Sequence, residues 1–508
     1  MNHLKSLCVG LSLASVFPFV AAAQSEQTYP QKTNLPTVYV ETENGQAITS
    51  KENYVNATLR YVDESGVKLY DALGIRGRGN STWGLDKKPY RIKFDKKQEF
   101  LGSEYANAKS WTLLANYTDK TLMRNALAAY VGKLAGQPFV PAARFVDLVL
   151  NGKFLGSYQI SDQIEIRKKR VDITEQDEVA TSDSNITGGY FLEVDGFATQ
   201  EPVYFRTNKG VTITIKSPDE DIINYNQRNY IKNHIQAFET ALFSSNFTDP
   251  ELGYRRYVDS ETLASWYVAS EITGNPDAFW STYIYKKADD DKIYWGPMWD
   301  YDIAFNNCYR KGDMSRKSLA SDGYGQDLTG VWINQMWKDP WFVQLVYAKW
   351  QELKAMDLET LMMNFIDEKA AELQQSQTLN FGIWSLSKRV YDEYRLFNTY
   401  EQGVDFMKQS IKTHLSFLDD LFTRNYVSAI GEIGDDARCV ASYNRANQTL
   451  QFSNPERTGM VELFTPSGVA VMRAPMSETV GLSALPSGIY IIRYTSVPNT
   501  TSTLKISK

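Results

Sequence analysis

The chain has 508 residues, 43% hydrophobic and 13% aromatic, which is enough for a large core and about two to four domains. Its net charge is −6, with both signs mixed along the chain, which argues against a general nucleic-acid binder. Residues 1–23 are predicted to be a signal peptide, because Lys5 precedes an apolar run at 7–22 that ends in Ala21-Ala22-Ala23. Removing Lys5 lowers the net charge to −7, and no later run predicts a transmembrane span.

Histidine and cysteine are scarce after the signal peptide: only His234, His414, Cys308 and Cys439 remain. This excludes a His/Cys zinc cluster, HExxH and CxxC. Both histidines lie in helix-like stretches and are expected to flank the core rather than to serve a Ser-His-Asp triad. Cys308 and Cys439 could form a disulfide in an oxidising compartment, but they are far apart in the sequence, which leaves their pairing open. The chemistry must then come from Asp, Glu, Lys, Arg and Asn.

After a polar leader at 24–34, alternating and β-branched residues predict a strand-rich region. The predicted strands are 37–40, 57–62, 68–75, 90–94, 110–115 (or a short helix), 144–150 and 153–160. The last two are joined by Asn151-Gly152, which predicts a tight hairpin. Helix-period apolar residues predict a helix at 119–134.

A basic, glycine-rich segment spans residues 75–100 (IRGRGNSTWGLDKKPYRIKFDKKQEF). Its glycines allow tight turns and a close approach of the backbone to a ligand. Its cations include Arg76, Arg78, Lys87, Lys88, Arg91 and Lys93. Glycines and cations beside a strand suit the phosphates of an anionic ligand, although the spacing matches neither of the common phosphate-binding motifs. A basic hairpin that faces solvent is the alternative.

Beyond predicted strands at 190–194 and 211–215, the chain becomes mostly helical. Helices are predicted at 225–243, 260–273, 332–356, 358–374 and 404–424. A Gly/Ser/Asp-rich loop at 311–327 is expected to cover a site. The composition changes near Gly431, and seven short predicted strands with turn triplets between them indicate a separate, small all-β sandwich.

Three acids surround a predicted hairpin whose strands are 282–286 and 293–299. Asp277 precedes the hairpin and Asp300 follows it, so folding of the hairpin brings them together although they are 23 residues apart. If residues 299–303 are extended, Asp302 points to the same side as Asp300. Three converging carboxylates predict a hard-cation site of the kind that holds magnesium on a nucleotide. The alternative for Asp302 is an ion pair with a nearby Arg or Lys.

Several motifs in one order resemble the spore-coat protein H (CotH) kinase family over about residues 35–425. They are IRGRGNSTWGLDKKPYRIKF, VDLVLNGKFLGSYQISDQIE, GGYFLEVDG, TIKSPDED and GPMWDYDIAFNN. The resemblance implies an α+β, divergent two-lobed protein-kinase-like fold, with a β-rich N-terminal lobe and a helical C-terminal lobe. It also implies ATP- and Mg²⁺-dependent phosphate transfer to Ser or Thr hydroxyls of a partner protein outside the cell.

The resemblance also implies roles for single residues. Asp277 matches the catalytic-loop acid, Asp300 the magnesium-binding acid, and Asp302 the second acid of the W-D-x-D motif. Ser281 stands where the family often has an Asn that holds a second metal ion, and Ser is a weaker ligand. The implied nucleotide-binding residues are Arg78, Asn80, Ser81, Lys88 and Lys93, with Lys88 or Lys93 as the phosphate-pairing lysine, and Asp162 near adenine.

Residues 431–508 resemble the C-terminal sorting domain of type IX secretion, through VELFTPSGVAVMRAP, LSALPSGIYIIRYTS and STLKISK. This implies contact with secretion machinery and a secreted or cell-surface location. Two other functions compete. A non-catalytic surface-binding protein is favoured by Ser281 and by the poor supply of ATP outside cells. A glycoside hydrolase would also use paired acids and aromatics, but a neutral sugar has no use for the charge of the basic segment.

Overall fold

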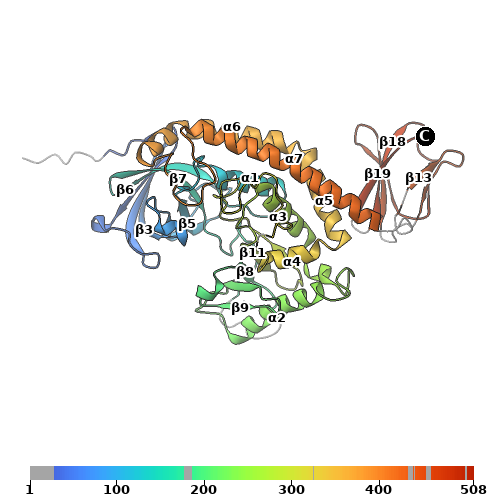
Figure 1. Cartoon of the computed structure of the whole chain (residues 1–508), viewed down its shortest axis with the longest axis horizontal. Coiled ribbons are helices and arrows are strands. Elements are labelled where there is room, and N and C mark those ends of the chain that lie inside the picture. The colour runs from blue at the N-terminus through green and yellow to red at the C-terminus, as the bar shows by residue number, and fades with distance from the viewer. Residues whose placement is uncertain are drawn as a thin grey trace, which may run out of the picture.

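The computed structural model describes residues 28–176, 186–323, 325–432, 439, 441–453, 459–497 and 500–508. These residues form a mixed α+β structure with seven α-helices and several sheets. A β-barrel lies at one end, a second sheet and the helices form the middle, and two small sheets lie at the C-terminal end (Figure 1). The predicted signal peptide, residues 1–23, lies outside the described residues.

Seven strands close into the barrel in the order β1-β2-β3-β4-β5-β7-β6. They are β1 (Thr37–Thr42), β2 (Val55–Asp63), β3 (Gly66–Gly77), β4 (Tyr90–Gln98), β5 (Ala108–Leu114), β6 (Arg144–Leu150) and β7 (Lys153–Asp162). Alternate residues such as Val38, Val40, Ile75 and Ile92 are fully buried in its core. Parallel pairing of β1 with β6 closes the barrel, and the strands predicted in this region are confirmed.

The Asn-Gly hairpin is also confirmed, since Asn151 (φ 49°) and Gly152 (φ 76°) both have the left-handed backbone that a type I′ turn requires. The predicted helix at 119–134 starts later, as α1 (Arg124–Leu134). The physical reason is a side chain that holds the preceding residues in a non-helical turn. Asp119 accepts hydrogen bonds from the backbone N–H of Thr121 (2.8 Å) and Arg124 (2.7 Å), which fixes the chain before the first helical turn.

The second sheet has five strands in the order β12-β11-β8-β10-β9. They are β8 (Tyr190–Asp195), β9 (Tyr204–Arg206), β10 (Thr212–Ser217), β11 (Ser281–Lys286) and β12 (Ile293–Trp295). The predicted hairpin at 282–299 is present, but β12 ends at Trp295 instead of 299. Gly296 and Pro297 follow, and proline has no N–H to donate to a ladder. Residues 296–300 are therefore free to form the turn that carries Asp300.

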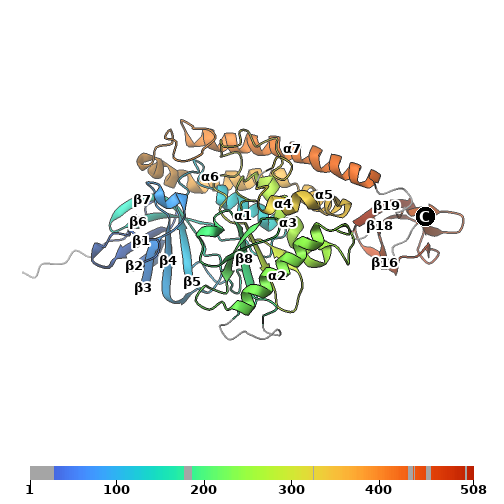
Figure 2. The same cartoon turned by 60° about the horizontal axis from the view of Figure 1, so that its bottom comes forward.

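Helices cover the sheet and continue past the barrel. They are α2 (Tyr225–Leu242), α3 (Ser260–Thr273), α4 (Thr329–Met336), α5 (Pro340–Ala355), α6 (Leu358–Ile383) and α7 (Tyr400–Glu432). The prediction of one helix at 332–356 is wrong, because Asp339 caps Trp341 (3.0 Å) and Pro340 starts a new helix. The long helices α6 and α7 lie side by side in Figures 1 and 2, and α6 also contacts β7. Within the described ranges, no helix is both long and apolar enough to cross a bilayer.

The C-terminal region contains two small sheets, β13-β14-β17 and β16-β15-β18-β19. The strands are β13 (Ala441–Asn444), β14 (Thr449–Phe452), β15 (Met460–Phe464), β16 (Ala470–Pro475), β17 (Thr479–Gly481), β18 (Ile489–Val497) and β19 (Thr500–Ser507). Their apolar residues form a cluster that draws only on residues 439–506, with Leu450 and Ile492 fully buried. Cys308 and Cys439 are buried thiols that do not form a disulfide with each other.

Candidate active site

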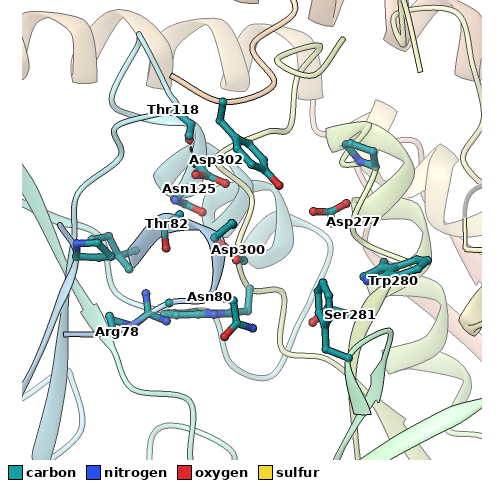
Figure 3. Close-up of a pocket in the computed structure, with 18 of the residues that line it drawn as sticks. Arg78, Asn80, Thr82, Thr118, Asn125, Asp277, Trp280, Ser281, Asp300 and Asp302 are labelled. Carbon is teal, nitrogen blue, oxygen red and sulfur yellow. Dashed lines mark hydrogen bonds between the residues drawn. The ribbon is translucent and has the colours of Figure 1, made fainter. Parts of the chain in front are cut away.

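A cavity of about 760 Å³ lies where the barrel, the five-stranded sheet and the turn that carries Asp300 meet. Figure 3 shows Arg78 and Thr82 on one side, Asp277 and Trp280 on the other, and Asp300 between them. Most of the site residues predicted from the sequence line this cavity. They are Arg78, Asn80, Ser81, Asp277, Ser281, Asp300 and Asp302.

Asp300 sits on a turn that is fixed from both sides. Its own backbone has a left-handed conformation (φ 67°), and its carbonyl accepts a hydrogen bond from Asn275 Nδ2 (3.2 Å). The next N–H, that of Tyr301, donates to Asn125 Oδ1 (2.7 Å). The extended segment 299–303 considered from the sequence is not present, because Asp300 has a left-handed backbone and a turn runs over residues 302–306. Asp300 and Asp302 still line the same cavity.

Asp302 is held by the loop before α1. Thr118 Oγ1 donates to Asp302 Oδ2 (2.5 Å), and Asn307 Nδ2 donates to the Asp302 carbonyl (2.9 Å). Burial, followed by repulsion from Asp300, raises the pKa of Asp302 to about 7, and the Thr118 hydrogen bond opposes this only in part. From the sequence, an ion pair with an Arg or Lys was the alternative role for Asp302, but the hydrogen-bond partner of its carboxylate is Thr118.

Asp300 is exposed to solvent within the cavity, whose walls surround its carboxylate. Burial raises the pKa of Asp300, and the positive charge of Arg78 opposes the rise. The Arg78 guanidinium in turn lies over the Trp299 ring, 5.2 Å from its centroid. Arg78 is thus fixed by an aromatic ring on the residue next to Asp300, at the cavity wall.

The acids do not form the three-carboxylate cluster that the sequence predicted. In the part of the chain that the structure describes, no group of three or more His, Cys, Asp or Glu residues is arranged to hold a metal ion. Magnesium is usually held by one or two carboxylates together with substrate phosphates and water. Asp300 and Asp302 fit that smaller donor set, because their mutual repulsion would be relieved by a dication between them.

Asp277 occupies the loop between α3 and β11. Its N–H donates to Asn275 Oδ1 (3.2 Å), and its carbonyl accepts from Trp280 and Ser281 (both 3.0 Å), so the loop is a closed turn. Its carboxylate lies 3.4 Å from Arg310 Nη2. Burial raises the pKa of Asp277, Arg310 lowers it, and Asp300 raises it further. The same buried Asn275 side chain thus contacts the backbones of both Asp277 and Asp300.

One face of the five-stranded sheet forms a polar wall of the cavity. It is built by alternate residues of three neighbouring strands: Ser281 and Tyr283 on β11, Glu193 and Asp195 on β8, and Lys216 on β10. Ser281 Oγ donates to Glu193 Oε1, and Glu193 Oε2 lies 3.1 Å from Lys216 Nζ. Neither Glu193 nor Lys216 was predicted from the sequence as a site residue. The available signal was a polar residue at every second position within otherwise apolar strands.

Three predicted nucleotide-binding residues have other surroundings. Lys88 Nζ donates to the carbonyl of Trp83 (2.7 Å), and the exposed Lys93 lies 6.0 Å from the Tyr54 ring. Asp162 is buried and paired with Arg170 Nε at 2.6 Å. None of the three belongs to the cavity lining, although Arg78, Asn80 and Ser81 of the same prediction do.

The cavity is bordered by the predicted 311–327 loop, which contributes Lys311, Gly323, Gly325 and Asp327 to the lining. A buried acid on α3, Glu271, holds this loop. It accepts hydrogen bonds from Ser318 Oγ (3.0 Å) and from the N–H groups of Leu319 (2.8 Å) and Ala320 (3.0 Å). These contacts satisfy a carboxylate that would otherwise be costly to bury.

Comparison with known proteins supports a family assignment. The family described as CotH kinase protein matches residues 75–418, about two thirds of the chain and all of the cavity lining. A comparison with curated proteins found no match. The matched region contains barrel strands β4 to β7, the second sheet and the cavity lining, and the chain belongs to the CotH kinase family of atypical kinase-like proteins.

Proposed function

We propose that this protein is an exported, ATP- and Mg²⁺-dependent protein kinase that phosphorylates Ser or Thr hydroxyls of a surface or secreted protein. The observation that carries the proposal is the order of groups across one cavity, with Arg78 on one side, Asp277 on the other and Asp300 between them (Figure 3). A cation for phosphates, an acid for a metal ion and an acid for an acceptor hydroxyl are the parts that phosphoryl transfer needs.

In this reaction the acceptor oxygen forms a bond to the γ-phosphorus of ATP, and the bond from that phosphorus to the bridging oxygen of ADP breaks. Asp277 orients the acceptor hydroxyl and receives its proton. Its contact with Arg310 favours the ionised carboxylate, which is the form that accepts a proton. Arg78 neutralises charge on the phosphates from the opposite wall.

Asp300 and Asp302 would hold magnesium, which, when bound, neutralises charge on the phosphate oxygens. Ser281 is a weaker candidate ligand, because its hydroxyl already donates to Glu193. Asn80 and Ser81, on the segment between β3 and β4, are proposed to approach the nucleotide. Lys88, Lys93 and Asp162 lie outside the cavity lining, so a direct contact with the nucleotide would need a change in the segments that carry them.

The wider organisation is part of the proposal. The barrel would serve as the N-terminal lobe and the helical region as the C-terminal lobe of a kinase-like domain at about 35–425. The two C-terminal sheets would pack as a sandwich at 431–508 that directs secretion to the cell surface after removal of residues 1–23. The separate apolar cluster at 439–506 supports such an independent module.

A non-catalytic binding protein on the same fold is the second candidate. The observation in its favour is Ser281, whose hydroxyl is engaged by Glu193 at the position where the family often has a metal-ligating Asn. Calorimetric titration of the mature protein with ATP, with and without Mg²⁺, separates the two. Magnesium-dependent ATP binding supports the kinase, and an absence of binding at millimolar ATP supports the binding protein.

A further inference from the structure

The polar wall of the cavity contains a connected chain of three side chains from three strands. Ser281 on β11 donates to Glu193 on β8, and Glu193 lies 3.1 Å from Lys216 on β10. The register pairs Tyr283 with Glu193 and Ser281 with Asp195, so these side chains lie on the cavity face of the sheet. A second acid, Glu201, lies 3.9 Å from Lys216 Nζ.

Alternation along β10 places Lys216 on the cavity face of the sheet, because Thr214, two residues earlier, pairs with Glu193. The pairing of β10 with β8 shifts register between Ile215 and Ser217, which leaves Lys216 at a β-bulge. The Lys216 side chain lines the cavity and is 30% exposed, so its ammonium is accessible to a ligand.

Three lysines of the basic segment at 75–100 are placed differently from Lys216. Lys88 and Lys93 lie outside the lining. Lys87 lines the cavity, but its ammonium is buried and donates to the carbonyls of Ala115 (2.7 Å) and Ser157 (2.5 Å) and to Asn380 Oδ1 (2.9 Å). Three oxygen partners use all three of its donors. Lys87 therefore ties the barrel to α6 and has no donor left for a ligand.

We propose that the Lys216 ammonium, braced by Glu193 and Glu201, contacts the phosphates of the bound nucleotide and supplies the positive charge that a second metal ion supplies in ordinary kinases. The inference rests on the proposed function and deepens it. In protein kinases the catalytic-loop Asn holds the second magnesium ion. In this chain Ser281 is the candidate for the position of that Asn. Its hydroxyl donates to Glu193, which in turn pairs with Lys216.

Charge balance supports this assignment. Burial lowers the pKa of Lys216, but the acids around it, with Glu193 first among them, together outweigh burial and raise the pKa, so the ammonium stays charged at neutral pH. Two carboxylates bracing one ammonium limit its rotation, which lowers the entropic cost of a contact with phosphate. The proposed enzyme therefore uses one metal ion, at Asp300 and Asp302, and one fixed ammonium.

The test uses the mature full-length protein and three nucleotides. Calorimetry at saturating Mg²⁺ measures the Kd of ATP, ADP and AMP for the wild type, Lys216→Met and Lys88→Met. We expect Lys216→Met to raise the Kd of ATP about tenfold or more and the Kd of AMP less than about threefold. The matched control Lys88→Met should leave all three Kd values unchanged. An equal loss for all three nucleotides, or no loss of ATP affinity, overturns the proposal.

A second measurement does not depend on the variant folding well. Electron paramagnetic resonance of Mn²⁺ counts the metal ions bound per protein–ATP complex, and we expect one in the wild type. Two tightly bound ions overturn the inference while leaving the kinase proposal intact. If the wild type binds no ATP, both proposals fail. Lys216→Arg, which keeps the charge, is expected to retain ATP affinity within about threefold.

Discussion

Arg310 lies between Asp277 and Asp392, with Nη2 at 3.4 Å from Asp277 Oδ1 and Nε at 2.6 Å from Asp392 Oδ2. The contact joins the proposed catalytic acid to a loop more than a hundred residues further along the chain. The backbone reinforces it, because the N–H of Tyr309 donates to the Asp392 carbonyl (2.8 Å). Arg310 is thus held in place by Asp392 and lowers the pKa of Asp277 from there.

Arg310→Met should move the acid limb of the pH–rate profile to higher pH. Without the guanidinium, burial and Asp300 raise the pKa of Asp277 unopposed, so a smaller fraction of this base is ionised at a given pH. The pair is about 40% exposed and screened, so we expect a loss of about fivefold in kcat/KM near pH 6, equivalent to ~1 kcal/mol. Arg256→Met, outside the cavity, is the control. An unshifted acid limb would show that Arg310 does not tune Asp277.

Arg78→Met should weaken ATP binding with little effect on folding. Arg78 lines the cavity and its charge acts on Asp300, whereas Lys88 in the same segment bonds to Trp83. Loss of one charged hydrogen-bond donor costs about 1.5–3 kcal/mol. Calorimetry of Arg78→Met and Lys88→Met should therefore give a weakened and an unchanged ATP affinity, respectively. The reverse order would move the phosphate contact away from Arg78.

Asp302 should make stability depend on pH when no divalent cation is present. Its pKa in the folded protein, about 7, lies above its ordinary value, so the folded state holds the proton more tightly than the unfolded state. The stabilisation is complete at acid pH below the ordinary pKa and is lost as the pH rises through about 7. Asp302→Asn should therefore gain ~1–3 kcal/mol relative to the wild type at pH 8.5 and little at pH 5.

Urea unfolding in EDTA at both pH values checks this, with the exposed Asp322→Asn as the control. The protonation of Asp302 also affects magnesium binding. Because the ion binds the ionised carboxylate, Mg²⁺ affinity should rise as the pH increases through about 7, with release of a proton. A Mg²⁺ affinity that is flat between pH 6 and 8 would place the ion away from Asp302.

A chain that ends at residue 432 should fold like the full-length protein. The apolar cluster of the C-terminal sheets uses only residues 439–506, and the two large cores use only residues up to 422. We expect circular dichroism and the urea midpoint of residues 24–432 to match the main transition of the mature protein. Loss of the folded signal would mean that the C-terminal sheets support the kinase region.

The sequence predicted the elements whose signals are local. The barrel strands, the Asn-Gly hairpin and the hairpin between Asp277 and Asp300 follow from alternation and turn residues. The strand expected at 293–299 ended early, because Gly296 and Pro297 outweigh the apolar residues around them. The helix expected at 332–356 divided at Asp339-Pro340, a cap signal that apolar periodicity alone does not reveal.

The site was predictable where its residues are close in sequence. Asp277, Ser281, Asp300 and Asp302 fall on one hairpin and its flanks, and all line the cavity. Glu193 and Lys216 come from strands whose neighbours are set by sheet order, which one sequence does not specify. The sequence offered Lys88 and Lys93 as the phosphate contact, and their absence from the cavity lining depends on tertiary structure, such as the Trp83 carbonyl that binds Lys88.

The central claim is that Asp300 serves the metal-bound phosphates and Asp277 serves the acceptor hydroxyl. Asparagine is the suitable replacement at position 300, because it keeps the size of aspartate and tolerates the left-handed backbone found there (φ 67°). Asp277→Asn, with the same loss of one charge in the same cavity, is its matched partner. Both variants should retain the far-UV circular dichroism spectrum of the wild type.

The most direct test is transfer of labelled γ-phosphate to a broad panel of protein acceptors, measured with Mg²⁺-dependent ATP affinity for both variants. We expect both variants to lose transfer by about a hundredfold or more, Asp300→Asn also to lose ATP affinity, and Asp277→Asn to keep it. Transfer at the wild-type rate by Asp300→Asn would contradict the account.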